Sequence, residues 1–184
     1  YLRAEGYDAW SRPKDIEWAD DYPVVNIRWD EVVKFCKWLS LVSGKEWRLP
    51  TNKEWETAAG ETKYFWGDYF PPKATDGNYS IMPNGTIDPE RVGMDGKTGP
   101  VGSFSANALG FHDLGGNVWE WVSDLWGENG LVTNHKHWKH VLCGGSWRDG
   151  ENGGIIKRSK GNDKDGEYNR FNNYGFRVCR VTDS

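Results

Sequence analysis

The residues best suited to metal or redox chemistry in this sequence are three cysteines and a short run of histidines. Cys36, Cys143 and Cys179 are odd in number and form no CxxC pair, which argues against a zinc ribbon or a disulfide-rich scaffold. Cys36 lies on the apolar side of a predicted helix and Cys179 in an apolar run, so buried, unreactive thiols are expected. A bridge between Cys143 and Cys179 is the alternative.

The histidines lie in the stretch "HKHWKH", which contains His135, His137 and His140. Three histidines can hold a zinc ion when their side chains converge. In a strand, however, His140 would face away from the other two. A solvated loop or strand is therefore favoured over a zinc site, and we assign no metal to this stretch.

Composition predicts one compact domain over residues 1–184, with 37% hydrophobic and 15% aromatic residues and 12 Trp. A net charge of -4 argues against nucleic acid or an anionic membrane as a partner. No apolar run approaches membrane-spanning length. The chain begins with Tyr1 rather than Met, so we expect a trimmed chain whose signal or lipid anchor, if there is one, precedes it.

Two helices are predicted to position the rest of the chain. The first is "WDEVVKFCKWLSLVSG" (29–44), with Asp30 as its cap, Gly44 as its left-handed end and an apolar side formed by Val32, Phe35, Leu39 and Val42. The second is "RLPTNKEWETAAG" (48–60), in which Thr51 and Glu54 have capping-box spacing. Both helices are expected to pack on an aromatic core.

The remaining segments are predicted as short strands and long loops. We expect a strand at 24–29 ("VVNIRW"), and strands in "HVLCGGSW" and "GFRVCRV". Residues 63–98 are loop-like, and such a long connection must be ordered by aromatic side chains or a bound cation. Gly115 and Gly116 permit a tight turn that brings Asp113, Asn117 and Glu120 near one another.

The order of six blocks resembles the formylglycine-generating enzyme (sulfatase-modifying factor) family. The blocks are "YPVVNIRWDEVVKFCKWLS" (22–40), "WRLPTNKEWETAAG" (47–60), "WGD" (66–68), "PVGSFSANALGFHDLGGNVWEW" (100–121), "GGSW" (144–147) and "GFRV" (175–178). The resemblance implies an α+β, C-type-lectin-like fold of the formylglycine-generating-enzyme type, with short strands, two main helices and long ordered loops.

The family's oxidases use two cysteines shortly after the GGS motif to bind copper and activate oxygen. This chain has no cysteine between Gly144 and Arg177, so it lacks that soft-metal site and its thiol chemistry. The related sulfoxide synthases take their iron-binding histidines largely from an additional helical domain, for which this chain is too short. We therefore predict no enzymatic activity of either kind and no required cofactor.

The resemblance also implies a structural calcium site in the block around "GNVWEW". Carried onto this chain, its hard oxygen ligands would be the side chains of Asp113 and Glu120 with the carbonyls of Gly116 and Val118. The alternative is an ordinary turn in which both carboxylates accept backbone N–H groups. A second, weaker calcium site is implied near Asn78 and Asp95, where the spacing departs from the family pattern.

Residues 148–174 form an unusually polar segment with five Gly, five Asn and eleven charged residues. In size and in ending with "GGSW…GFR", the chain resembles the variable proteins of diversity-generating retroelements, a subset of this fold. In those proteins, adenine-directed mutagenesis rewrites Asn codons in the C-terminal segment, and the altered side chains form a ligand-binding surface. Asn codons with a pyrimidine third base can then yield Arg, Asp, Gly, Tyr, Phe or Ser, but not Lys, Glu, Trp, Met or Gln.

That mechanism defines a set of candidate variable, ligand-binding positions. They are Arg148, Asp149, Gly150, Asn152, Gly161, Asn162, Asp163, Asp165, Tyr168, Asn169, Phe171, Asn172 and Asn173. Lys157, Lys160, Lys164, Glu151 and Glu167 fit it less well. Composition alone favours an ordinary polar surface loop, but the segment occupies the position of the family's active site, and its mixture of residues resembles that of evolved binding loops.

The leading hypothesis is a non-enzymatic, surface-displayed recognition protein, with Trp119 and Trp147 beneath the variable surface. Changing Arg148 or Phe171 should then weaken binding with little loss of melting temperature. The resemblance implies a monomeric lipoprotein at the extracellular or outer-membrane surface, whose ligand is a protein or cell-surface molecule. The alternatives are a divergent oxidase or modifying enzyme, and an accessory protein with one fixed partner.

Overall fold

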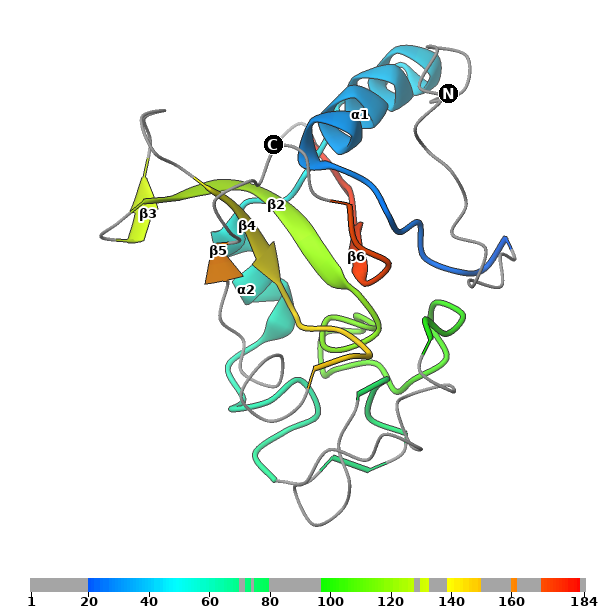
Figure 1. Cartoon of the computed structure of the whole chain (residues 1–184), viewed down its shortest axis with the longest axis vertical. Coiled ribbons are helices and arrows are strands. Elements are labelled where there is room, and N and C mark those ends of the chain that lie inside the picture. Colours follow the sequence, from blue (N-terminus) through cyan, green and yellow to red (C-terminus); the bar gives the residue numbers. More distant parts are fainter. Residues whose placement is uncertain are drawn as a thin grey trace.

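The computed structural model describes residues 20–69, 72–73, 75–79, 97–127, 130–132, 139–149, 160–161 and 170–182. Its centre is the antiparallel pair β2 (Trp119–Gly127) and β4 (Lys139–Cys143), flanked by helices α1 (Trp29–Ser43) and α2 (Asn52–Ala59). In Figure 1 the loops at residues 61–69, 75–79 and 97–118 gather at the end of the molecule far from α1. The predicted α+β architecture, with two main helices, short strands and long loops, is confirmed.

The main sheet is built around β2. Strands β3 (Gly130–Val132) and β4 pair with β2 antiparallel, β5 (Lys160–Gly161) pairs with β4, and β6 (Tyr174–Phe176) pairs with β2 in parallel. A separate two-stranded sheet joins β1 (Trp47–Arg48) to β7 (Cys179–Arg180). The predicted strand in "HVLCGGSW" is present as β4, which ends at Cys143 before GGSW, and the one in "GFRVCRV" is present as two short strands, β6 and β7.

Side chains that alternate along the strands of the sheet pack into two apolar clusters, one on each face. Trp119, Trp121 and Leu142 pack in one cluster with Val32 and Cys36 of α1. The second cluster joins Trp55 and Ala59 of α2 to Val122, Val141 and Cys143. Neighbouring residues of β4 thus point to opposite faces, as the pleat of a strand requires. The sheet is covered by one helix on each face, and large aromatic side chains contribute to both cores.

Helix α1 forms as predicted but begins differently. The N-cap is Arg28, whose backbone N–H donates to the Glu31 carboxylate at 2.9 Å, and Asp30 lies in the first turn. Gly44 ends the helix with φ 66°. The predicted apolar side is too long at its C-terminal end, because Val42 is 60% exposed.

The strand predicted at 24–29 is wrong. Asn26 has φ 60°, a left-handed conformation that interrupts any extended ladder. Its backbone N–H instead donates to the carbonyl of Phe171 at 2.9 Å. The alternation of apolar residues that suggested a strand here reflects Val25 and Ile27 turning inward from an irregular segment, where both are buried.

Helix α2 has the predicted capping box. Thr51 Oγ1 accepts from the backbone N–H of Glu54 at 3.1 Å, and the Glu54 carboxylate accepts from the backbone N–H of Thr51 at 2.7 Å. Arg48 binds the same carboxylate, and its hydrogen bond, together with those from Thr51, lowers the pKa of Glu54 to about 2. These contacts fix the start of the helix against β1.

The long loop after α2 is held to the sheet by buried amide groups. Asn117 Oδ1 accepts from Asn78 Nδ2 at 3.2 Å and from the Gly99 N–H at 2.9 Å. Asn117 Nδ2 donates to the Gly99 carbonyl at 3.1 Å. Asn78 and Asn117 are both 1% exposed, so they join three distant segments in the interior.

Among the residues that the structure describes, no helix is both long and apolar enough to span a bilayer.

Candidate functional site

The GGSW motif turns the chain from β4 towards the candidate surface. Gly144 and Gly145 have φ 96° and 79°, a region in which side chains are strained. A Cβ atom on Gly144 would also lie 2.7 Å from the Leu114 carbonyl oxygen. Two consecutive glycines are therefore needed for the turn, and Ser146 follows them with its side chain fully buried.

Asp149 fastens the start of the polar segment to the sheet. Its Oδ2 accepts from the Trp119 indole N–H at 2.7 Å and from the Ser146 hydroxyl at 2.5 Å. Asn173, only 9% exposed, donates to the same hydroxyl at 3.0 Å, and its carbonyl accepts from the Trp119 backbone N–H at 2.8 Å. The two ends of the segment therefore meet at Trp119. We call Trp119, Ser146, Asp149 and Asn173 the Trp119 clasp.

Arg170 fastens the far end of the segment to α1. Its guanidinium pairs with Glu31, whose side chain is completely buried, and also donates to the Asn26 carbonyl at 3.2 Å. Arg28 lies 3.6 Å from the same carboxylate. Burying a carboxylate without a charged partner costs free energy of folding. Arg170 is therefore kept beside Glu31, and the chain around Arg170 is held against α1. We call Arg170, Glu31 and Asn26 the Arg170 clasp.

Other candidate binding residues beside these clasps face solvent. Arg148 is exposed, Phe171 is 39% exposed with its ring 4.7 Å from that of Tyr174, and Asn172 is half-buried. Trp147 holds the turn through its backbone N–H, which donates to the Asn117 carbonyl at 3.0 Å. Its indole N–H is buried and has no acceptor within the described part of the chain.

The structure covers part of the predicted binding segment. Gly161 lies in β5, opposite Val141 of β4. Seven candidates lie outside the described residues: Gly150, Asn152, Asn162, Asp163, Asp165, Tyr168 and Asn169. All candidate positions stay predictions as ligand contacts, and the structure gives Asp149 and Asn173 internal partners instead.

The predicted turn does bring Asp113, Asn117 and Glu120 together. All three line one pocket of about 410 Å³, along with Val118 and Arg177. The turn relies on left-handed backbone at Asp113 (φ 55°), Gly116 (φ 77°) and Asn117 (φ 58°). Asp113 Oδ2 accepts from the Gly102 N–H at 2.6 Å. Burial raises the pKa of Asp113, and the nearby charge of Glu120 adds to the rise.

The arrangement of Glu120 does not suit the predicted calcium ligand set. Its two oxygens accept from Nε and Nη2 of Arg177, both at 2.6 Å, and Oε2 also accepts from the Trp55 indole at 2.7 Å. A guanidinium already neutralises this carboxylate and occupies both of its oxygens. Calcium through Asp113, Gly116, Val118 and Glu120 stays an untested prediction. The second site also stays untested, since Asp95 lies outside the described residues, and the Asn78 side chain already donates to the Lys97 carbonyl and to Asn117.

The three thiols are poorly suited to nucleophilic or redox chemistry. Cys36, Cys143 and Cys179, all within the described residues, form no disulfide bond, so the alternative of a bridge between Cys143 and Cys179 is absent from the structure. Burial raises the pKa of Cys36 to about 11 and also raises the pKa of Cys179. The thiolate forms are therefore disfavoured. The prediction of buried thiols holds for Cys36, and Cys179 is half-buried.

His140 is a core residue. It is 4% exposed, and its ring stacks on Trp29 with a centroid separation of 3.9 Å. Burial lowers its pKa to about 4, so the ring is neutral at neutral pH. His135 and His137 lie outside the described residues. Within the described ranges, no group of three or more His, Cys, Asp or Glu residues is placed to hold a metal ion.

Two arginines that organise the site are not predicted from the sequence. Arg177 interrupts the apolar run "GFRVC", and a charge inside such a run is a usable signal of a buried ion pair, here with Glu120. Arg170 offered no comparable signal. Its partner Glu31 lies 139 positions away, on a helix whose sequence shows only ordinary amphipathic spacing.

The chain matches the sulfatase-modifying factor enzyme 1-like domain over residues 3–182. A formylglycine-generating enzyme of Thermomonospora curvata is 37% identical over 119 residues, covering 61% of this chain and 37% of the enzyme. The inactive C-alpha-formylglycine-generating enzyme 2 of Mus musculus is 34% identical over 169 residues, covering 86% of this chain and 49% of that protein. The chain thus spans half or less of the length of these relatives.

Two solved structures have the same fold. Treponema denticola variable protein 1 has a TM-score of 0.70 at 22% identity, covering 93% of this chain and 76% of that chain. PvdO from Pseudomonas aeruginosa also has a TM-score of 0.70, at 23% identity, covering 99% of this chain and 75% of that chain. With the domain match extending over nearly its whole length, the chain belongs to the sulfatase-modifying factor enzyme 1-like domain family.

Proposed function

We propose that this chain is a non-enzymatic, surface-displayed ligand-binding protein whose C-terminal segment, about residues 148–174, is diversified by a retroelement. The observation that carries the proposal is the arrangement at the two ends of that segment. Buried polar contacts hold Asp149 and Arg170, while the neighbouring Arg148 and Phe171 are exposed. Such a frame lets surface side chains change without loss of the fold.

Five of the candidate positions that the structure describes fall into two groups. Arg148, Phe171 and Asn172 are at least partly exposed and are suited to contact a ligand. Asp149 and Asn173 contribute to the Trp119 clasp and act as framework. Arg and Phe at exposed positions belong to the residue types that are enriched in protein interfaces. The ligand class that suits them is a protein or another cell-surface molecule.

Several further observations support a role without catalysis. The chain has no cysteine between Gly144 and Arg177, and burial raises the pKa of Cys36 and Cys179. Its relatives include an inactive formylglycine-generating enzyme, and its fold is also that of a treponemal variable protein. The same proposal places the full-length protein on the extracellular or outer-membrane surface as a monomeric lipoprotein, with no cofactor required.

An enzyme remains the second candidate because one pocket holds two carboxylates. Asp113 and Glu120 both line the 410 Å³ pocket, and burial raises the pKa of Asp113. A carboxyl group with a raised pKa is a typical general acid or base. The ion pair between Glu120 and Arg177 argues for a structural use of the second carboxylate. Mass spectrometry of cysteine-containing sulfatase peptides incubated with the protein and oxygen tests for the family oxidation.

The proposed function is tested first at the gene. The DNA downstream should contain a near-copy of the sequence encoding residues 144–177 beside a reverse transcriptase gene. The copy should differ from the coding sequence only where the copy has adenine. A locus without this repeat would contradict diversification and favour a protein of the same fold with one fixed partner.

A further inference from the structure

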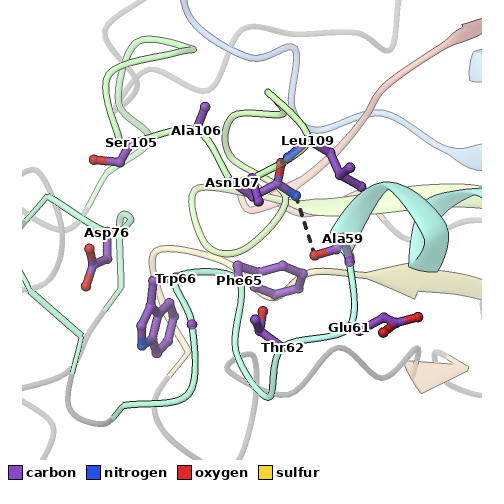
Figure 2. A pocket seen from close by; sticks show the side chains of 13 residues that line it. Ala59, Glu61, Thr62, Phe65, Trp66, Asp76, Ser105, Ala106, Asn107 and Leu109 are labelled. Atoms are coloured by element: carbon purple, nitrogen blue, oxygen red, sulfur yellow. Dashed lines mark hydrogen bonds between the residues drawn. The ribbon is translucent and has the colours of Figure 1, made fainter.

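A second cavity lies away from the C-terminal segment, in the loops that follow α2. It has a volume of about 290 Å³ and is lined by the stretches 59–62, 65–67 and 105–109 together with Asp76. In the view of Figure 2, Asp76 and Glu61 lie at opposite ends, Trp66, Phe65 and Thr62 lie between them, and Ser105, Ala106 and Asn107 lie across from the aromatic rings. None of the lining residues belongs to the segment 148–174.

The walls of this cavity are held by hydrogen bonds, so its shape is formed in advance. Asn107 Nδ2 donates to the Ala58 carbonyl at 2.7 Å, and Asn107 Oδ1 accepts from the backbone N–H groups of Leu109 and Phe111, each at 3.0 Å. The Ser105 N–H donates to the Thr75 carbonyl at 3.0 Å. These bonds tie the loop 105–109 both to the end of α2 and to the segment that carries Asp76.

The side of the cavity that contains Trp66 and Asp76 is also held in place by hydrogen bonds and ring stacking. The Trp66 indole donates to the Tyr69 carbonyl at 2.8 Å and its ring stacks on Tyr64 with centroids 5.1 Å apart. Asp76 Oδ2 accepts from the Tyr69 hydroxyl at 2.7 Å and from the Lys73 N–H at 2.6 Å. The Asp76 carboxylate is therefore held at one end of the cavity by two hydrogen bonds.

The charge and polarity of the residues that line the cavity indicate which class of ligand it can bind. Two carboxylates, Glu61 and Asp76, accompany the rings of Phe65 and Trp66 and small side chains, and the described lining residues include no Lys or Arg. Carboxylates and aromatic rings both attract cations, and Trp is the strongest of the rings. Two of the chain's own lysines, Lys63 and Lys73, already place their ammonium groups 5.1 Å from the neighbouring rings of Tyr64 and Tyr69.

The volume of the cavity and the residues around its opening further restrict the kind of molecule that can bind there. At 290 Å³ the cavity is at the lower limit of the roughly 300–1,000 Å³ usual for small-molecule sites, which suits one side chain. Part of its rim is apolar and open to solvent, because Leu109 is 58% exposed and Ala106 and Ala108 are also exposed. A partner surface around an inserted side chain would cover this rim, whereas a free amine would leave it in water.

We propose that this cavity binds a single basic side chain, lysine or arginine, of a polypeptide partner. The alkyl stem lies along Phe65 and Trp66, and the charged head pairs with Asp76. This site is separate from the proposed diversified surface. It therefore gives the protein a contact that does not change when residues 148–174 change.

The test uses capped amino acids titrated into the isotopically labelled chain and followed by NMR. Nα-acetyl-lysine methylamide or its arginine counterpart should give saturable shifts at Gly67, Ala106 and the Trp66 indole. Nα-acetyl-norleucine methylamide has the same stem without the ammonium group and should give none. Equal shifts with the norleucine probe, or none with either basic probe, would overturn the proposal.

Two variants locate the bound probe, and a third is their control. Asp76→Asn keeps an oxygen that can accept from Tyr69 and Lys73 but removes the charge, and it should weaken binding at least about tenfold. Ala106→Leu narrows the cavity with the charges retained and should also weaken binding. Asp68→Asn alters an exposed carboxylate of the same loop that does not line the cavity, and should bind as the wild type does. Undiminished binding by Asp76→Asn or Ala106→Leu would place the probe elsewhere.

Discussion

At the scale of single residues, neighbouring positions in the C-terminal segment have different tasks. Arg148 is exposed, and Asp149 accepts hydrogen bonds from Trp119 and Ser146. Both residue types are ones that the proposed mutagenesis of Asn codons could produce, and their sequence context gives no reason to separate them. The difference arises because Trp119, which lies 30 positions away, supplies an indole N–H at that point.

This contrast predicts opposite outcomes for two adjacent alanine substitutions. Asp149→Ala leaves two donors without an acceptor and should lower the free energy of unfolding by about 2 to 4 kcal/mol. Arg148→Ala should change it by less than about 0.5 kcal/mol, as for an ordinary surface position. Urea unfolding followed by tryptophan fluorescence measures both. Equal losses in the two variants would show that Arg148 is also part of the framework.

At the scale of elements, α1 and β4 meet through an aromatic contact that contains a titratable group. His140 of β4 stacks on Trp29 at the start of α1, and burial lowers its pKa to about 4 from the ordinary 6.5. Between these two values the unfolded chain binds a proton that the folded chain does not. The contribution of His140 to the free energy of unfolding therefore falls as the pH falls from about 6.5 to about 4.

His140→Phe should remove this pH dependence and keep the stacked ring. Relative to wild type, its free energy of unfolding should rise by roughly 1 to 3 kcal/mol as the pH falls from about 6.5 to about 4. Glu54→Gln is the matched control, because the pKa of Glu54 is lowered to about 2 and its effect is expected below pH 4.5. Parallel pH profiles for wild type and His140→Phe between 6.5 and 4 would contradict this account.

The elements that the sequence predicted correctly are those specified by local signals. The capping box at Thr51, the left-handed Gly44 and the turn at Gly115 and Gly116 all act within a few residues, and all appear as expected. The strand predicted at 24–29 failed because the backbone of Asn26 is bonded to Phe171, a partner 145 positions away. Alternation alone cannot distinguish a strand from an irregular segment with the same inward-facing residues.

At the scale of the whole molecule, distant contacts decide what the site can do. The Arg170–Glu31 and Arg177–Glu120 pairs join the C-terminal region to α1 and to β2, and neither pairing is visible in local sequence. The family could be predicted because its blocks keep their order over most of the chain. The roles of Asp149 and Asn173 could not, because composition treats every Asn and Asp in the segment alike.

If a buried frame carries a diversified surface, the sequences of this gene in many natural isolates should differ mainly on that surface. Substitutions should concentrate at exposed or partly exposed positions such as Arg148, Phe171 and Asn172. Asp149, Arg170 and Asn173 should keep their residue types in the same isolates. Variation spread evenly over the chain, or variation that replaces the framework residues as often as the exposed ones, would contradict the account.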